Sequence, residues 1–177
     1  EFLARLRAAH PDIDLRLTSN GVMLAPHASL LKDLGVRVNL SLDSLRPERF
    51  AAVTGRDLLP RVMEALDALQ KHGVPLKLNA VAMRGVNDDE LPDFLRLAAE
   101  RGLDVRFIEF MSMGEGTLWS DSTYWPAQEI LQEARHLVEL GPAESNAALD
   151  GPATMHAIRG TKGRFGLITP LSCHFCA

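Results

Sequence analysis

Cysteine is scarce in this sequence, since Cys173 and Cys176 are the only two among 177 residues. Two thiols so close together exclude a disulfide framework. Long apolar runs are also missing, and the first residues have neither the basic lead nor the apolar block of a signal peptide. We therefore expect a cytoplasmic protein that does not use a membrane.

Basic residues are in slight deficit, because 19 Lys and Arg stand against 23 Asp and Glu and give a formal net charge of −4. This balance argues against general binding to DNA, RNA or an anionic membrane, which needs a broad basic surface. Residues 151–177 differ from the rest, because they contain Arg159, Lys162 and Arg164 and no acid. Either a small anion binds near this tail, or a short segment happens to lack acids.

Several catalytic templates are absent, namely GxGxxG after a strand, GxxxxGK[ST], HExxH and GxSxG. Residues 173–176 form a CxxC pair. That pair permits a redox couple or half of a metal site, but four-coordinate iron or zinc needs more ligands than two thiolates. The missing partners would have to lie beyond Ala177, which suggests a chain cut short.

The sequence does contain an alternation of apolar-rich strands with amphipathic helices, and its 46% hydrophobic content is enough for one core. This order predicts a parallel α/β sheet. A capping box is expected at Asn87 and Glu90. The predicted strands are Asp14–Thr18, Val36–Asp43, Leu76–Met83 and Asp104–Met111, and the predicted helices are Pro26–Leu34, Leu58–Lys71 and Asp88–Arg101.

The pattern changes after Met111. A glycine-punctuated loop leads to a helix near Pro126–Arg135 and to an irregular connection over Gly141–Pro152. Two strand-like runs follow, and Thr161-Lys162-Gly163 joins them as a hairpin. We therefore predict two parts: residues 1–118 as a partial (β/α) barrel and residues 119–177 as part of a covering α+β region.

Each predicted strand has a polar face and an apolar face, because side chains alternate with period two. If the leucine-rich faces meet the helices, the polar faces line a wet interior. In the fourth strand we expect Glu109 and Met111 to share the polar face, with Arg106 on the other. The polar faces of the first three strands are predicted to contain Arg16, Thr18 and Asn20; Asn39, Ser41 and Asp43; and Lys77 and Asn79.

Three interpretations of these polar faces stay open at this point. The first is an internal ion-pair network, such as Lys77 with Asp43 or Glu109. The second is a ligand site near the carboxyl ends of the strands, where barrels bind their ligands. The third makes Lys77 a desolvated Schiff-base lysine of the aldolase kind.

Ordered sequence motifs then point to a family. The segments LTSNG at 17–21, VNLSLD at 38–43, LKLN at 76–79, RGVNDDE at 84–90, RFIEFM at 106–111 and FGLIT at 165–169, followed by FCA at 175–177, occur in this order. Together they resemble the GTP 3',8-cyclases of molybdenum cofactor biosynthesis, members of the radical S-adenosylmethionine superfamily. The resemblance implies an incomplete (β/α) barrel, here its last four strand-helix units, with part of a C-terminal covering region.

The resemblance also implies site residues. Ser41 and Met111 match contacts to S-adenosylmethionine, and Thr18 and Lys77 match contacts to GTP. Cys176 matches the first ligand of the second of two 4Fe-4S clusters, whereas Cys173 matches no ligand. A hydroxyl and an ammonium suit a polyanionic nucleotide, so the positions of Thr18 and Lys77 make chemical sense.

The implied reaction is radical cyclisation of GTP to (8S)-3',8-cyclo-7,8-dihydroguanosine 5'-triphosphate, the first step of molybdenum cofactor biosynthesis. The family's CxxxCxxC radical-cluster motif is not in these 177 residues. We therefore expect an internal fragment that is inactive alone. The implied associations are a homodimer and a functional link to the next pathway enzyme, which makes cyclic pyranopterin monophosphate.

Two other functions remain open from the sequence. One is a different radical S-adenosylmethionine enzyme with an auxiliary cluster, of the peptide maturase type. The other is a non-catalytic fragment that binds a nucleotide or a partner.

Overall fold

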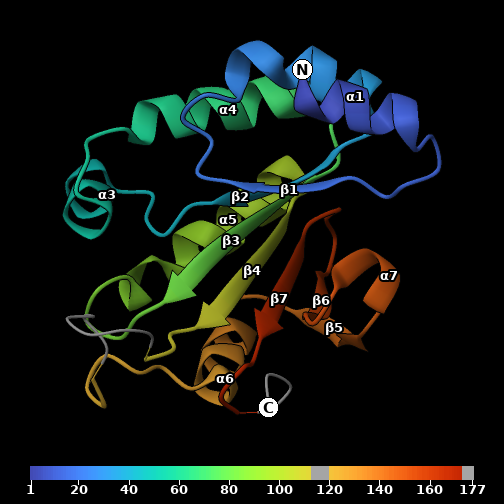
Figure 1. Cartoon of the computed structure of the whole chain (residues 1–177). Helices are drawn as coiled ribbons and strands as arrows, with labels where there is room; N and C mark the ends of the chain where they lie inside the picture. The colour runs from blue at the N-terminus through green and yellow to red at the C-terminus, as the bar shows by residue number, and fades with distance from the viewer. Residues whose placement is uncertain (113–119, 173–177) are drawn as a thin grey trace.

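The computed structural model describes residues 1–112 and 120–172, and it places seven strands in one sheet with the order β1-β2-β3-β4-β7-β6-β5 (Figure 1). Strands β1 to β4 and β7 are parallel, whereas β6 and β5 run antiparallel at the far end. The predicted α/β architecture is confirmed. The strands are β1 Arg16–Ser19, β2 Arg37–Ser41, β3 Leu76–Ala82, β4 Asp104–Glu109, β5 Leu140–Glu144, β6 Thr154–Ile158 and β7 Arg164–Ile168.

Amphipathic helices connect and cover these strands. Helix α4 buries Val62, Leu66 and Leu69 against the sheet, as expected for one apolar stripe. No helix in the described parts of the chain is long and apolar enough to cross a membrane. The α-helices are α1 Phe2–Ala9, α2 Ala28–Asp33, α3 Pro47–Thr54, α4 Leu59–Lys71, α5 Leu91–Arg101, α6 Ala127–Leu137 and α7 Ala147–Asp150, with 3-10 helices η1 Ala25–His27 and η2 Asp88–Glu90.

An aromatic cluster forms the centre of the larger core. The ring of Phe107 on β4 lies 5.3 Å from that of Phe94 on α5, 5.8 Å from Phe165 on β7 and 6.3 Å from Trp125. All four side chains are nearly or fully buried. Edge-to-face pairs at these distances stabilise beyond their buried area, so β7 is packed firmly onto the parallel strands.

Four elements were not predicted from the sequence, namely α1, α3, α7 and β5. The strand β5 lies in the segment expected to be an irregular connection, and it contains Pro142. Proline is tolerated there because β5 is the last strand of the sheet, and an edge strand can lack one backbone donor.

The predicted capping box is also wrong. Asn87 precedes η2 but makes no side-chain cap. Instead its amide donates to the carbonyl oxygens of Asp43 (2.7 Å) and Val81 (2.8 Å) and accepts from the Met83 N–H (2.8 Å). Asn87 therefore ties together the ends of β2 and β3, because tertiary partners were available that a local pattern could not show.

Candidate functional site

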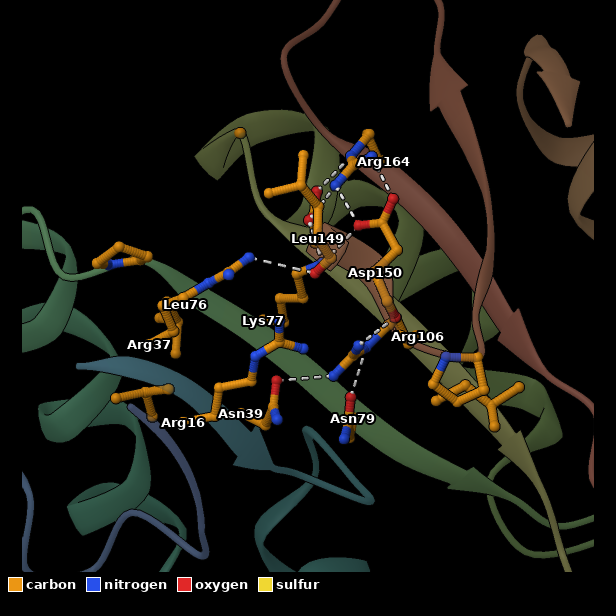
Figure 2. A pocket seen from close by; sticks show the side chains of 17 residues that line it. Arg16, Arg37, Asn39, Leu76, Lys77, Asn79, Arg106, Leu149, Asp150 and Arg164 are labelled. Carbon is orange, nitrogen blue, oxygen red and sulfur yellow. Dashed lines mark hydrogen bonds and ion pairs between the residues drawn. The ribbon is translucent and has the colours of Figure 1, made fainter. Parts of the chain in front are cut away.

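A cavity of about 520 Å³ lies against the polar face of the sheet (Figure 2). Its walls come from the first halves of β1 to β4, from β7 and from the segment around α7. The cavity therefore lies toward the amino ends of β1 to β4, whereas the sequence analysis expected a ligand site near the carboxyl ends. Five of its lining residues are cations, Arg16, Arg37, Lys77, Arg106 and Arg164, whereas its lining acids are Asp104 and Asp150. The cavity is therefore suited to an anionic ligand.

Strand register brings these polar side chains together. Thr18 pairs with Asn39, Asn39 with Lys77, Lys77 with Asp104, and Asp104 with Arg164. Paired residues point to the same side of a sheet, so five strands contribute to one polar row. A second row, two residues further along, contains Ser41, Asn79 and Arg106.

Lys77 on β3 lies at the middle of the first row. Its Nζ lies 2.5 Å from Asp150 Oδ1 and 3.6 Å from Asp104 Oδ2, and it donates to the Leu149 carbonyl at 2.8 Å. The predicted ion pair with Asp43 or Glu109 is thus wrong in its partners. These contacts also fail to supply the apolar surroundings that a Schiff-base lysine needs.

Arg164 on β7 binds both acids of the cavity. It donates to both oxygens of Asp104 at 2.8 and 2.6 Å and to both oxygens of Asp150 at 3.2 and 2.9 Å. The hydrogen bond to Asp104 is the main cause of a raised pKa for Arg164. Burial alone would raise the pKa of Asp150, but hydrogen bonds from Arg164 and Lys77 lower it overall, so this carboxylate stays ionised.

Arg106 on β4 is the most deeply buried cation of the cavity, with 5% of its surface exposed. It donates to the Asn79 and Asn39 amide oxygens at 2.8 Å each and to the Asp150 carbonyl at 3.2 Å, as Figure 2 shows. Burial lowers its pKa. The two amides act as neutral clamps that fix the guanidinium toward the cavity.

The predicted polar face of β4 is wrong. Arg106 lines the polar cavity, whereas Glu109 is buried on the opposite face. There Glu109 accepts hydrogen bonds from the backbone N–H groups of Ala127 (2.9 Å), Leu171 (3.1 Å) and Ser172 (3.0 Å). The prediction chose the wrong face because it followed Glu109 and Met111, and alternation from Asp104 would have placed Arg106 correctly.

The predicted site residues lie in different places. Lys77 lines the cavity, whereas Thr18, Ser41 and Met111 do not. Thr18 is exposed and accepts a 3.5 Å hydrogen bond from Asn39, and half-buried Ser41 ends β2 in the second polar row. Met111 is half-buried two residues after β4, and Cys176 lies outside the described residues. The ligand roles of these residues remain predictions.

The loops at the carboxyl ends of β2 and β3 are braced together. Asp43 accepts the Val81 N–H at 2.8 Å, and burial raises the pKa of its carboxyl. Fully buried Glu90 accepts from the Ser44 hydroxyl and the Leu45 N–H at 2.7 Å each and pairs with Arg49 at 2.7 Å. These contacts fix the loop that follows Ser41 at the end of β2.

Sequence reasoning missed part of the site. Asp150 fell in the predicted irregular connection, and no local pattern relates it to Lys77, 73 residues away. For Arg164 the sequence indicates only that it is one of three basic residues in a segment without acids. Arg164 precedes the apolar Phe165 on a predicted strand, and this alternation could have shown that Arg164 points to the polar side of the sheet. Within the described residues, no group of three or more His, Cys, Asp or Glu side chains could hold a metal ion.

The mixed α/β sheet carries a polar cavity of ligand size, and comparison with known proteins gives the class of the protein. Residues 1–98 match the family described as Radical SAM superfamily, and the chain belongs to that superfamily. A solved structure titled "Native anSMEcpe with bound AdoMet" matches with a TM-score of 0.53 at 15% identity, over 75% of this chain and 39% of that one. This likeness shows the shared fold alone.

The relatives are more particular. Residues 103–177 match the family described as Molybdenum Cofactor Synthesis C. Proteins named GTP 3',8-cyclase are similar: that of Alkaliphilus oremlandii is 39% identical over 99% of this chain, and that of Geobacter sulfurreducens is 44% identical over 99%. That of Listeria monocytogenes is 40% identical over 98%. The resemblance found in the sequence motifs is confirmed. The chain spans about half the length of these relatives, 53 to 54%.

Proposed function

We propose that the intact protein containing this chain converts GTP to (8S)-3',8-cyclo-7,8-dihydroguanosine 5'-triphosphate in the first step of molybdenum cofactor biosynthesis. The observation that supports this proposal is the convergence of Lys77, Arg106 and Arg164 beside a 520 Å³ cavity. That volume lies within the range of about 300–1,000 Å³ typical of small-ligand sites. The relatives named GTP 3',8-cyclase, with about 40% identity, support the choice of substrate.

For the substrate, Lys77 supplies a cation to the triphosphate and Thr18 supplies a hydroxyl to the nucleotide. Arg106 adds a second cation, which Asn39 and Asn79 hold in a fixed direction. Charge-assisted hydrogen bonds to phosphate are about twice as strong as neutral ones. Together these groups orient the nucleotide inside the barrel and screen its charge.

S-adenosylmethionine and two 4Fe-4S clusters are the cofactors of the proposed enzyme. Bound S-adenosylmethionine would supply the radical chemistry of the reaction. The donor set fits this cofactor, because the Ser41 hydroxyl can hydrogen-bond its polar part and Met111 can pack against its adenine. Cys176 would be one ligand of the second cluster. The hydrogen bonds of Asp43 to the Val81 N–H and of Glu90 to the Leu45 N–H hold the loop after β2, and this keeps Ser41 in place.

The further proposals concern organisation and surroundings. We propose a cytoplasmic homodimer that passes its product to the enzyme making cyclic pyranopterin monophosphate. We also propose a functional division between residues 1–118, which contribute Thr18, Ser41, Lys77 and Met111, and residues 119–177, which lead to Cys176. Support comes from the separate family matches at residues 1–98 and 103–177.

The test is Lys77→Ala in the intact protein. We expect the affinity for GTP to fall about tenfold or more, the effect of losing a hydrogen bond to a charged group, with a much smaller change for S-adenosylmethionine. Calorimetric titrations with GTP and with S-adenosylmethionine measure the two changes in affinity. Lys71→Ala, a change at the exposed end of α4, is the matched control. An unchanged GTP titration, or equal losses for both ligands, contradicts the proposal.

A further inference from the structure

The cations of the cavity are bound by one short segment of the chain. Arg16 donates to the Ala148 carbonyl at 2.6 Å, Lys77 to the Leu149 carbonyl at 2.8 Å, and Arg106 to the Asp150 carbonyl at 3.2 Å. These three carbonyls end helix α7, and the Asp150 carboxylate adds a full negative charge between Lys77 and Arg164. The segment thus presents a row of oxygens to the cations, as a polyphosphate would.

Apolar packing contributes little to holding this segment. Residues 142–149 are all exposed, Leu149 is 51% exposed, and Asp150 is the one buried residue of α7. The helix has only four residues, with the Asn146 side chain accepting the Leu149 N–H at its start. Its attachment therefore depends mainly on charge, and charged contacts can be exchanged for stronger ones.

Charge balance favours such an exchange. Five cations line the cavity against two lining acids, Asp104 and Asp150, and Asp14 just outside the lining pairs with Arg16 and Arg37, so the cations still exceed these acids by two charges. A triphosphate brings more negative charge to this surface than one carboxylate and three carbonyl dipoles do. Asp104 is part of β4 and remains in place, whereas Asp150 belongs to the weakly packed segment.

We propose that the segment Asn146–Gly151 is a displaceable internal counter-anion, whose Asp150 carboxylate occupies a phosphate position and leaves when a polyphosphate ligand binds. The identity of that ligand as GTP rests on the proposed function, whereas the exchange of anions does not. A purely positioning role for Asp150 makes the opposite prediction, because its removal would then disorder Lys77 and Arg164 and weaken binding.

The experiment compares Asp150→Asn with the unchanged intact protein, using inorganic tripolyphosphate and GTP as separate probes. Removing one competing charge is expected to tighten tripolyphosphate binding about three- to tenfold. Asp33→Asn, which removes an exposed carboxylate of α2, should leave the affinity unchanged. Weaker or unchanged binding by Asp150→Asn overturns the proposal.

Hydrogen exchange in the unchanged protein gives a second test that does not depend on a variant folding. The amides of Leu149, Asp150 and Gly151 donate to the carbonyls of Asn146 and Ala147. A helix of four residues does not persist without its contacts, so displacement by tripolyphosphate should break these bonds and speed the exchange. Slower or equal exchange overturns the proposal. If tripolyphosphate shows the expected effects but GTP does not bind, the counter-anion stands and the cyclase function fails. If GTP binds but tripolyphosphate binds equally to both proteins, the counter-anion fails alone.

Discussion

Among single residues, Glu109 shows how a buried charge is made stable. Its carboxylate is 1% exposed, and it accepts three backbone N–H bonds and the Ser172 hydroxyl. Burial alone would raise the pKa of Glu109, but these hydrogen bonds lower it overall. The residue therefore attaches the start of α6 and the segment after β7 to the end of β4, and this attachment needs the ionised form.

Glu109→Gln should lower the free energy of unfolding at neutral pH by about 2–3 kcal/mol, because an amide cannot accept all of these bonds. The substitution should also make the free energy of unfolding less dependent on pH in the acid range. A lowered pKa contributes stability that is present above the unfolded value near 4.5 and is lost as the pH falls through the folded value. Urea titrations between pH 7 and pH 3 measure both effects. Glu129→Gln, at an exposed pair with Arg84, is the control, and a variant as acid-sensitive as the original protein would contradict this role.

Among the elements, the connection from β6 to β7 is seated directly on α5. Gly163 is buried there, and a Cβ at this position would lie 2.2 Å from the Ala98 carbonyl oxygen. Neither backbone can yield without moving the helix or the strand. Glycine is therefore required by close approach of two elements, and this contact helps to set β7 beside β4.

Gly163→Ala should destabilise the protein by about 1–3 kcal/mol, the usual cost of overpacking. Gly141→Ala is the matched control, because the new Cβ would meet Ala157 at an ordinary 3.6 Å. Thermal unfolding of both variants measures the difference. Equal melting temperatures would show that β7 can shift away from α5 without cost.

At the scale of the whole molecule, the two proposed functional parts share one sheet and one core. Strand β7 pairs with β4 over five residues, and Phe107 contacts Phe94, Phe165 and Trp125. A common core of this kind favours cooperative unfolding. The division near residue 118 is thus expected to concern function more than stability.

Phe107→Ala should cost about 3–5 kcal/mol, the range for removing a buried aromatic side chain. Its unfolding should remain a single transition, with tryptophan fluorescence and far-ultraviolet circular dichroism giving the same midpoint. Phe2→Ala, at a 73% exposed position, is the control and should change little. Two separate midpoints would indicate that the parts unfold independently.

The sequence predicted most of the architecture because local rules govern it. The period of apolar residues predicted the four parallel strands, the helices between them and the polar face containing Asn39 and Lys77. It failed for β4, where the prediction took Glu109 and Met111 as the polar face although Asp104 and Arg106 form it. It also failed for α7, which has four residues and one buried side chain, too little for any periodic signal.

The amino-acid sequence by itself determined the alternating strands and helices, the polarity of the two faces of the first three strands and the family, since these depend on neighbouring residues and ordered motifs. Only the tertiary structure decided which cations meet and that Asp150 lies between Lys77 and Arg164. The physical reason is the distance along the chain, because Asp150 is 44 residues from Arg106 and 73 residues from Lys77. Contacts of that kind arise from sheet register and chain closure, which no local pattern encodes.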